Sequence, residues 1–220
     1  SNYAEAWKGA RVGRSFANSI LVCLITLAVL TVITSMASYI LTRVTKSRLL
    51  SVYFSLGIMI PAHALLIPSV LIFKRLHLID HLSGLMIVYT AVNISFAMFI
   101  MNGFMEGIPR ELDEAATIDG CGRAGIFFHI VFPVAKPGIA TVATITFLNC
   151  WNDLLLGLVL ISTPARKTLS MTISALKGSY VTQYGLLCAG FVISIVPVVF
   201  MYLLFQKQVI AGMTAGAVKG

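Results

Sequence analysis

The acidic residues of this chain are concentrated in one stretch, and their side chains are the first that could do chemistry. Five of the eight acids lie close together: Glu106, Glu111, Asp113, Glu114 and Asp119. The stretch is a polar island between two long apolar runs, so its carboxylates are offered to a partner in water. The alternative is a capped surface helix-turn-helix that merely joins two membrane spans. The residues alone leave both interpretations open.

Asp153 is the one acid inside an apolar run. A charge at the centre of a bilayer costs about 2.5–3.5 kcal/mol, so such a residue usually faces a cavity or a partner. The alternative is a shallow position near the far interface, where Asp153 caps a helix or pairs with a Lys or Arg. An intramembrane enzyme using Asp153 and a histidine would need paired titratable groups in a dry pocket. No second carboxylate lies a helical turn away, so no catalytic residue is predicted.

The remaining reactive side chains do not form a recognisable site. The cysteines form no C-x-x-C pair and read as small apolar fillers, and the histidines lack metal-ligand spacing, so no metal site is predicted. Residues 120–125 fit the dinucleotide pattern G-x-G-x-x-G, but an acidic helical stretch precedes them rather than a strand. We therefore expect neither a metal nor a bound cofactor on this chain. The cysteines are Cys23, Cys121, Cys150 and Cys188, and the histidines are His63, His77, His81 and His129.

Two short helices are expected to hold the acidic stretch in shape. Pro109 suits the first turn of a helix that continues through Glu111, and Gly120 can adopt the left-handed conformation that ends it. A second helix follows, and Pro133 and Pro137 are expected to break it before the next span. Its apolar stripe consists of Ile126, Phe127, Ile130 and Val131.

The composition predicts an all-α, polytopic membrane protein. The chain is 58% hydrophobic and 11% charged, whereas soluble domains are about a quarter charged. The net charge of +8 forms no basic stripe with interleaved aromatic residues, so nucleic acid is not an expected partner; anionic lipid headgroups are. We expect one transmembrane domain over residues 1–220 with five spans, at about Phe16–Leu41, Leu50–Phe73, Leu82–Met101, Ile139–Ile161 and Leu186–Phe205.

Several polar or helix-breaking residues in these spans are candidates for a translocation path. Pro61 lies with a second proline in one span, which predicts a bent helix beside a path, although a packing kink is the alternative. Asn93 favours an interhelical hydrogen bond over a substrate contact. Trp151 offers a flat face on which sugars stack, but a tryptophan of the membrane interface is the ordinary explanation. Asn152 and Asp153 adjoin it.

The remaining segments connect or end the spans. Residues 1–15 suggest a short helix lying flat near the interface. Residues 162–184 suggest an interfacial helix, because Leu169, Ile173, Leu176 and Tyr180 recur at helical spacing. The tail over residues 206–220 contains three glycines and is expected to be flexible. Lysine and arginine counts are eight on each side, so the charges do not decide the orientation.

The acidic stretch also resembles a known motif. Glu114-Ala115-Ala116, followed by Asp119-Gly120 and then by Ile130 and Pro133, is similar to the Glu-Ala-Ala loop of binding-protein-dependent ABC importer permeases. The C-terminal sequence from Phe205 to Gly220 resembles that of maltose-type permeases. In this family the loop forms coupling helices that dock on a cytoplasmic ATPase, and the tail reaches into the ATPase dimer.

The resemblance implies a set of site residues and partners. The ATPase-coupling residues would be Glu111, Glu114, Ala115, Ala116, Asp119 and Gly120, within a coupling loop over residues 106–138. The tail contacts would be Thr214, Gly216 and Lys219. ATP and Mg²⁺ would bind a partner ATPase, since this chain has no G-x-x-x-x-G-K-[ST] loop. A second permease subunit and an extracytoplasmic solute-binding protein complete the expected complex.

The resemblance further implies a sugar importer in a prokaryotic cytoplasmic (inner) membrane, with the coupling loop and the C-terminus in the cytoplasm. A permease for a non-sugar solute such as a polyamine or an amino acid is the alternative. Such permeases typically have six spans, and the sixth would precede Ser1. We therefore expect a trimmed N-terminus.

Overall fold

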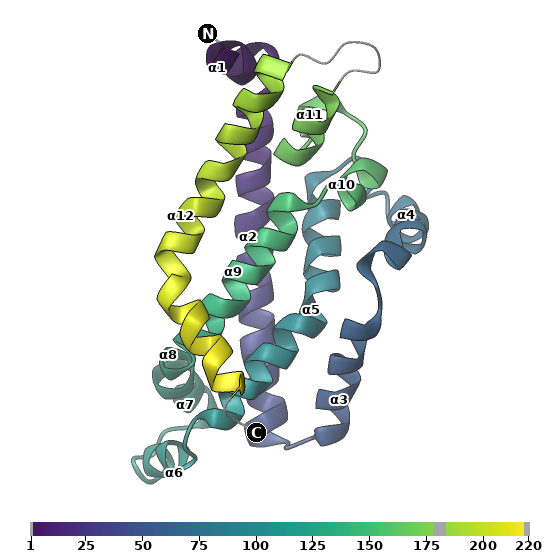
Figure 1. The fold of residues 1–220 in the computed structure, drawn as a ribbon. Coiled ribbons are helices and arrows are strands. Elements are labelled where there is room, and N and C mark those ends of the chain that lie inside the picture. Colours follow the sequence, from purple (N-terminus) through teal and green to yellow (C-terminus); the bar gives the residue numbers. More distant parts are fainter. Residues whose placement is uncertain (1, 178–183, 218–220) are drawn as a thin grey trace. The chain divides into compact units, whose positions relative to one another are not determined.

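The computed structural model describes the backbone of residues 2–177 and 184–217. Three single helical stretches are long and apolar enough to cross a membrane: Val12–Val44, Leu82–Gly107 and Tyr184–Gln206. Two bent helix pairs pass the same test together, so the described residues provide up to five spans. The expectation of an all-α bundle with about five spans is confirmed. Figure 1 shows the helices in chain order.

The chain divides into two compact units that alternate along the sequence. Unit 1 takes in Ser1–Leu27, Pro61–Thr90 and Phe147–Leu203, and unit 2 takes in Ala28–Ile60, Ala91–Thr146 and Leu204–Gly220.

The first helices are α1 (Asn2–Ala4), η1 (Glu5–Gly9), α2 (Val12–Tyr39) and the π-helical turn η2 (Ile40–Val44). A turn of helix therefore does precede the first span, as expected.

The second expected span is interrupted rather than merely kinked. It consists of α3 (Arg48–Leu56), η3 (Gly57–Met59), η4 (Ala62–Leu65) and α4 (Leu66–Arg75). Ile60 and Pro61 between them have extended backbones, with ψ angles of 114° and 126°. Proline at this point cannot continue the hydrogen-bonded ladder, so the predicted bend is confirmed and falls at Pro61.

The acidic stretch follows α5 (Leu82–Gly107) and forms α6 (Glu111–Ile118), α7 (Arg123–Ile126), η5 (Phe127–Val131) and α8 (Phe132–Val134). One proline prediction is wrong, because Pro109 precedes α6 instead of lying in its first turn. The predicted break before the next span is confirmed, and Pro137 lies in the first turn of α9 (Lys136–Asn152). Pro133 lies within the first turn of α8, where a missing N–H costs least. The break falls at Ala135, between helices bent by 70°.

The predicted C-terminal boundary of the fourth span is wrong. Helix α9 ends at Asn152, and Asp153 and Leu154 separate it from the short helix α10 (Leu155–Leu160). The apolar composition continued past this point, but composition does not reveal a break when a side chain supplies the local hydrogen bonds. Asp153 thus lies in a break rather than inside a continuous helix.

The last segments also differ from expectation. After η6 (Pro164–Arg166), α11 (Leu169–Ala175) buries Leu169, Met171 and Ile173, so the apolar side chains of the predicted interfacial helix pack against the protein rather than against lipid. Apolar periodicity cannot distinguish a protein partner from lipid. Tyr180 lies outside the described residues. Helix α12 (Tyr184–Ala217) continues through most of the expected flexible tail.

Candidate coupling site

The acidic helix α6 has well-defined ends. Glu111, Asp113 and Glu114 occupy its first turn, where negative charge opposes the positive end of the helix dipole. At the other end, the N–H of Gly120 donates to the carbonyl of Thr117 (3.0 Å), and the N–H of Cys121 donates to that of Ala116 (2.9 Å). These two bonds form a Schellman motif, which requires the left-handed φ of 81° found at Gly120. The predicted role of Gly120 in ending the helix is confirmed.

Helix α6 and the short helices after it pack into the apolar core of unit 2. Ala116, Ile126, Phe127 and Val131 are buried in one apolar cluster. The same cluster contains Leu30 and Tyr39 of α2, Ala97, Met101 and Met105 of α5, and Val142 of α9. The predicted apolar stripe of the second short helix is confirmed. The short helices α6 and α7 therefore share a core with three long helices.

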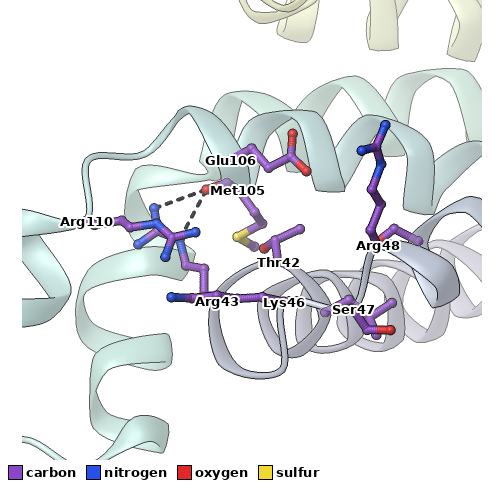
Figure 2. Close-up of a pocket in the computed structure, with 10 residues that line it drawn as sticks. Thr42, Arg43, Lys46, Ser47, Arg48, Met105, Glu106 and Arg110 are labelled. Atoms are coloured by element: carbon purple, nitrogen blue, oxygen red, sulfur yellow. Dashed lines mark hydrogen bonds between the residues drawn. The ribbon is translucent and has the colours of Figure 1, made fainter.

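Arg43, in η2 at the end of α2, joins three elements of unit 2. Its Nη1 donates to Asp113 Oδ2 of α6 at 2.6 Å, and its Nε and Nη2 each donate to the Met105 carbonyl at 3.1 Å. Nη2 also donates to the carbonyl of Ile108. Figure 2 shows the guanidinium beside Met105. Arg43 therefore satisfies carbonyls at the end of α5 that lack helical partners, and it fixes α6 to α2.

The Arg43–Asp113 link is strongly shielded from water. The Arg43 side chain is 4% exposed, and the Oδ1 atom of Asp113 is buried with no hydrogen-bond partner among the described residues. The Asp113 carboxylate is therefore compensated mainly through Arg43. The sequence prediction missed Arg43, since one arginine in a short basic turn gives no sign of which acid it will reach.

Tyr39 provides a second connection between α2 and the short helices. Its hydroxyl donates to the carbonyl of Arg123 at the start of α7 (3.2 Å), and its ring lies 5.3 Å from that of Phe127. Together with Arg43, this bond attaches both short helices to the end of one membrane-spanning helix.

The predicted coupling residues occupy different environments. Glu111, Glu114, Ala115, Asp119 and Gly120 are exposed, whereas Ala116 is buried in the core of its own unit. Ile118, which sequence reasoning did not single out, is 86% exposed. No atom lies within 4 Å of the space that a side chain at Gly120 would enter. The outer face of α6 thus combines exposed carboxylates with accessible small and apolar residues.

Asp153, a candidate for the translocation path, is held within unit 1. Its Oδ2 accepts hydrogen bonds from the Tyr89 hydroxyl (2.7 Å) and from the backbone N–H of Gly157 in α10 (3.0 Å). The second bond caps the first turn of that helix. The capping bond of that alternative is therefore confirmed, with a tyrosine rather than a Lys or Arg as the side-chain partner, while the shallow position of Asp153 stays a prediction.

Both interpretations of Trp151 require correction. Its side chain is 1% exposed, and its ring contacts Phe16 and Phe147, with centroids 5.6 and 5.4 Å away. Its Nε1 donates to the Ser194 carbonyl at 3.1 Å. The ring is a core element of unit 1 and presents no face to a sugar or to a membrane interface.

The other path and tail candidates are only located by the structure. Asn152 and Pro61 are exposed, and Asn93 is buried within α5. Thr214 and Gly216 lie within α12, and Lys219 lies outside the described residues. Their roles stay predictions.

Asp80 forms a second network in unit 1 that sequence reasoning missed. Its carboxylate accepts hydrogen bonds from the Thr163 hydroxyl (2.5 Å) and from the N–H groups of Ser162 (3.0 Å) and Thr163 (2.9 Å). Arg166 Nη1 lies 3.1 Å from Oδ2. The bonds from Thr163, and less strongly the other partners, lower the pKa of Asp80 to about 2. The turn before α5 is thereby fastened to the segment after α10.

These features define a multi-span membrane protein with a short helix pair anchored between two of its spans. Residues 31–214 match the family of binding-protein-dependent transport system inner membrane components, and the chain belongs to this family.

Similar proteins include the probable starch degradation products transport system permease of Thermoanaerobacterium thermosulfurigenes, which is 33% identical over 99% of this chain and 80% of the relative. The sulfoquinovosyl glycerol transport system permease of Agrobacterium fabrum is also 33% identical, over 100% of this chain and 78% of the relative. A bacterial ABC transporter involved in the import of the acidic polysaccharide alginate has the same fold. Its TM-score is 0.81 at 23% identity, with 94% of this chain and 78% of that chain covered.

Proposed function

We propose that this chain is one permease subunit of an ABC importer for a sugar or oligosaccharide. Family membership is the observation that carries the proposal. The relatives described above are named for starch degradation products and sulfoquinovosyl glycerol, which favours a carbohydrate over a polyamine or an amino acid. Solute would reach this subunit and a second permease subunit from an extracytoplasmic binding protein.

The helix pair α6–α8 is the proposed contact with a cytoplasmic ATPase dimer. Glu111, Glu114 and Asp119 would form ion pairs or hydrogen bonds with the ATPase, while Ala115 and Gly120 allow close approach. ATP and Mg²⁺ would be bound by that partner. This assignment places α6 and the C-terminus on the cytoplasmic side of the inner membrane, where Thr214, Gly216 and Lys219 of the tail would also meet the ATPase.

Coupling requires an element that can adopt two arrangements, and the binding of ATP and of solute must each change the balance between them. The proposed element lies in unit 2 and consists of α6 with the C-terminal ends of α2 and α5. Arg43 holds these three parts together. A shift of α6 caused by the ATPase would move these helix ends as one body. Buried contacts of this kind move together because packed interiors deform little.

The proposal is tested by placing a large side chain on the outer face of α6. The full transporter is expressed with its ATPase, second permease and binding protein, and Ala115→Trp is compared with Ala4→Trp, an exposed alanine outside the loop. We expect Ala115→Trp to abolish ATPase co-purification and uptake of labelled oligosaccharide, with Ala4→Trp close to wild type. Normal values for both readouts in Ala115→Trp would refute the docking role.

The solute class has a separate readout. Competition for uptake by unlabelled oligosaccharides, polyamines and amino acids distinguishes the carbohydrate proposal from the alternative. Inhibition by a polyamine or an amino acid but by no carbohydrate would overturn the solute assignment and leave the docking role intact.

A further inference from the structure

Unit 2 contains an open pocket of about 390 Å³ between the end of α2, the start of α3 and the end of α5. Four basic side chains line it: Arg43, Lys46, Arg48 and Arg110. Glu106 is the one acid among the lining residues. Figure 2 shows these side chains around the opening. The pocket is distinct from the outer face of α6, and the function proposed above gives no role to its side chains Lys46, Arg48 and Arg110.

The positive charge of the pocket is largely uncompensated. Within the described part of the chain, the ion pairs are Arg43–Asp113 and Arg166–Asp80. Arg43 is therefore already neutralised, but Lys46, Arg48 and Arg110 are exposed and form no ion pair with another described residue. Set against Glu106, they leave an excess of positive charge. This arrangement favours an anion.

The start of α3 adds hydrogen-bond donors to this charge. Ser47 caps the nine-residue helix by accepting a bond from the N–H of Leu50. The N–H groups of the first helical turn have no intrahelical acceptor, and they lie at the positive end of the helix dipole. Lys46, with a left-handed φ of 51°, reverses the chain so that this helix end faces the same pocket as the end of α2. Phosphate oxygens suit such donors.

The surroundings of the pocket are apolar on the side of α3. Leu49, next to the lining residue Arg48, is 81% exposed, and Tyr53 is 68% exposed one turn further on. The pocket also lies directly after the membrane-spanning stretch Val12–Val44. A basic pocket at the end of a span, with exposed apolar side chains beside it, matches the two parts of a phospholipid.

We propose that this pocket binds the phosphate of an anionic phospholipid headgroup. Lys46, Arg48 and Arg110 surround the phosphate, and the acyl chains lie along the exposed side of α3. The site would hold the junction between α2 and α3 at a fixed depth in the membrane. The same phosphate chemistry could come from free inorganic phosphate, and the experiment separates the two sources.

The test measures phosphatidylglycerol bound to the purified transporter complex by native mass spectrometry during titration with this lipid. The variant is Lys46→Gln/Arg48→Gln/Arg110→Gln. Its matched control, Lys74→Gln/Arg75→Gln/Lys167→Gln, removes the same charge from unit 1. Each basic residue near anionic lipid contributes about 1 kcal/mol, so we expect an affinity at least about tenfold weaker in the variant. The control and the wild type should agree.

Several outcomes would overturn the lipid site. These are equal phosphatidylglycerol binding by variant and control, equal preference of the wild type for phosphatidylcholine, or complete displacement of the lipid by inorganic phosphate at modest concentration. Loss of a protein subunit from the variant with unchanged lipid binding would assign the pocket to a protein partner instead. If the triple variant is unstable in a thermal melt, Arg48→Gln alone should still weaken lipid binding several-fold, and an unchanged affinity there would refute the proposal.

Discussion

The aspartates of unit 1 differ from the acids of α6 in unit 2 in how they are used. In unit 1, Asp80 contacts four neighbouring donor groups and Asp153 contacts two. In unit 2, Asp113 is engaged with Arg43, but Glu111, Glu114 and Asp119 of the same short helix are exposed. The comparison indicates that a carboxylate in this protein is structural when backbone N–H groups or an arginine surround it. The exposed acids of α6 are the ones that we propose meet a partner.

The largest loss of stability is expected on replacing Arg43. This arginine binds Asp113, the structural acid on the same helix as the exposed acids. Arg43→Met would leave the Asp113 carboxylate and two carbonyls without their donor. Breaking a buried pair typically costs about 3–5 kcal/mol, and the partial exposure of Asp113 reduces this to about 2–3 kcal/mol. Thermal melting of the purified complex measures the loss, with Arg43→Lys as the conservative control. A melting temperature unchanged in Arg43→Met would contradict the assignment of Arg43 as the anchor.

The next effect concerns the packing of α9 on α5 in unit 2. A Cβ added at Gly138 would lie 2.6 Å from the ring of Phe104, whereas one added at Gly103 would meet no atom within 4 Å. Gly138→Ala is expected to destabilise the protein by about 1–3 kcal/mol through overpacking. Gly103→Ala should be neutral or stabilising by up to about 1 kcal/mol, because alanine favours helix. Equal melting temperatures for the two variants would show that this contact is not tight.

Asp80 tests the structural use of acids in unit 1. Its pKa is lowered in the folded state, so its contribution to stability is present above the ordinary carboxyl pKa and is lost as pH falls from about 4 towards 2. After allowance for partial exposure, we expect Asp80→Asn to cost about 1–2 kcal/mol at neutral pH.

Amide hydrogen exchange measures this effect locally. The N–H groups of Ser162 and Thr163 donate to Asp80, so their protection should fall in Asp80→Asn, while amides in the core of unit 2 keep theirs. Undiminished protection at both positions would mean that the backbone, not the carboxylate, holds this turn.

The smallest effect on stability is expected at the exposed acids of α6. Glu114→Gln removes a charge from the first helical turn, which is worth about 0.3–1 kcal/mol through the helix dipole. The same change should nevertheless reduce ATPase co-purification clearly. A loss of stability comparable to that of Arg43→Met would place Glu114 among the structural acids and remove the contrast.

The sequence predicted those features that depend on local chemistry or on composition. The acids of α6, the φ of Gly120 and the bend at Pro61 follow from residue type, and the apolar runs reveal the spans. The failures concern long-range contacts. Trp151 packs against the distant ring of Phe16, and Arg43 meets an acid 70 positions later, so neither environment could be read from neighbouring residues.

The helix break at Asp153 was not predicted for the same reason, because it depends on contacts with other helices. A carboxylate in an apolar run was recognised as unusual, but its two bonding partners come from α5 and from the first turn of a separate helix. The burial of α11 was likewise invisible, because the same spacing of apolar residues suits a lipid surface and a protein core.

The central claim is that the outer face of α6 is the surface on which an ATPase docks. The most direct measurement is site-specific cross-linking from Ala115→Cys in a transporter whose native cysteines Cys23, Cys121, Cys150 and Cys188 have been replaced. Leu76→Cys, an exposed position in unit 1, serves as the control. The account predicts a cross-link between Ala115→Cys and the ATPase subunit, and none from Leu76→Cys. Absence of any ATPase cross-link from Ala115→Cys in an assembled, transporting complex would contradict it.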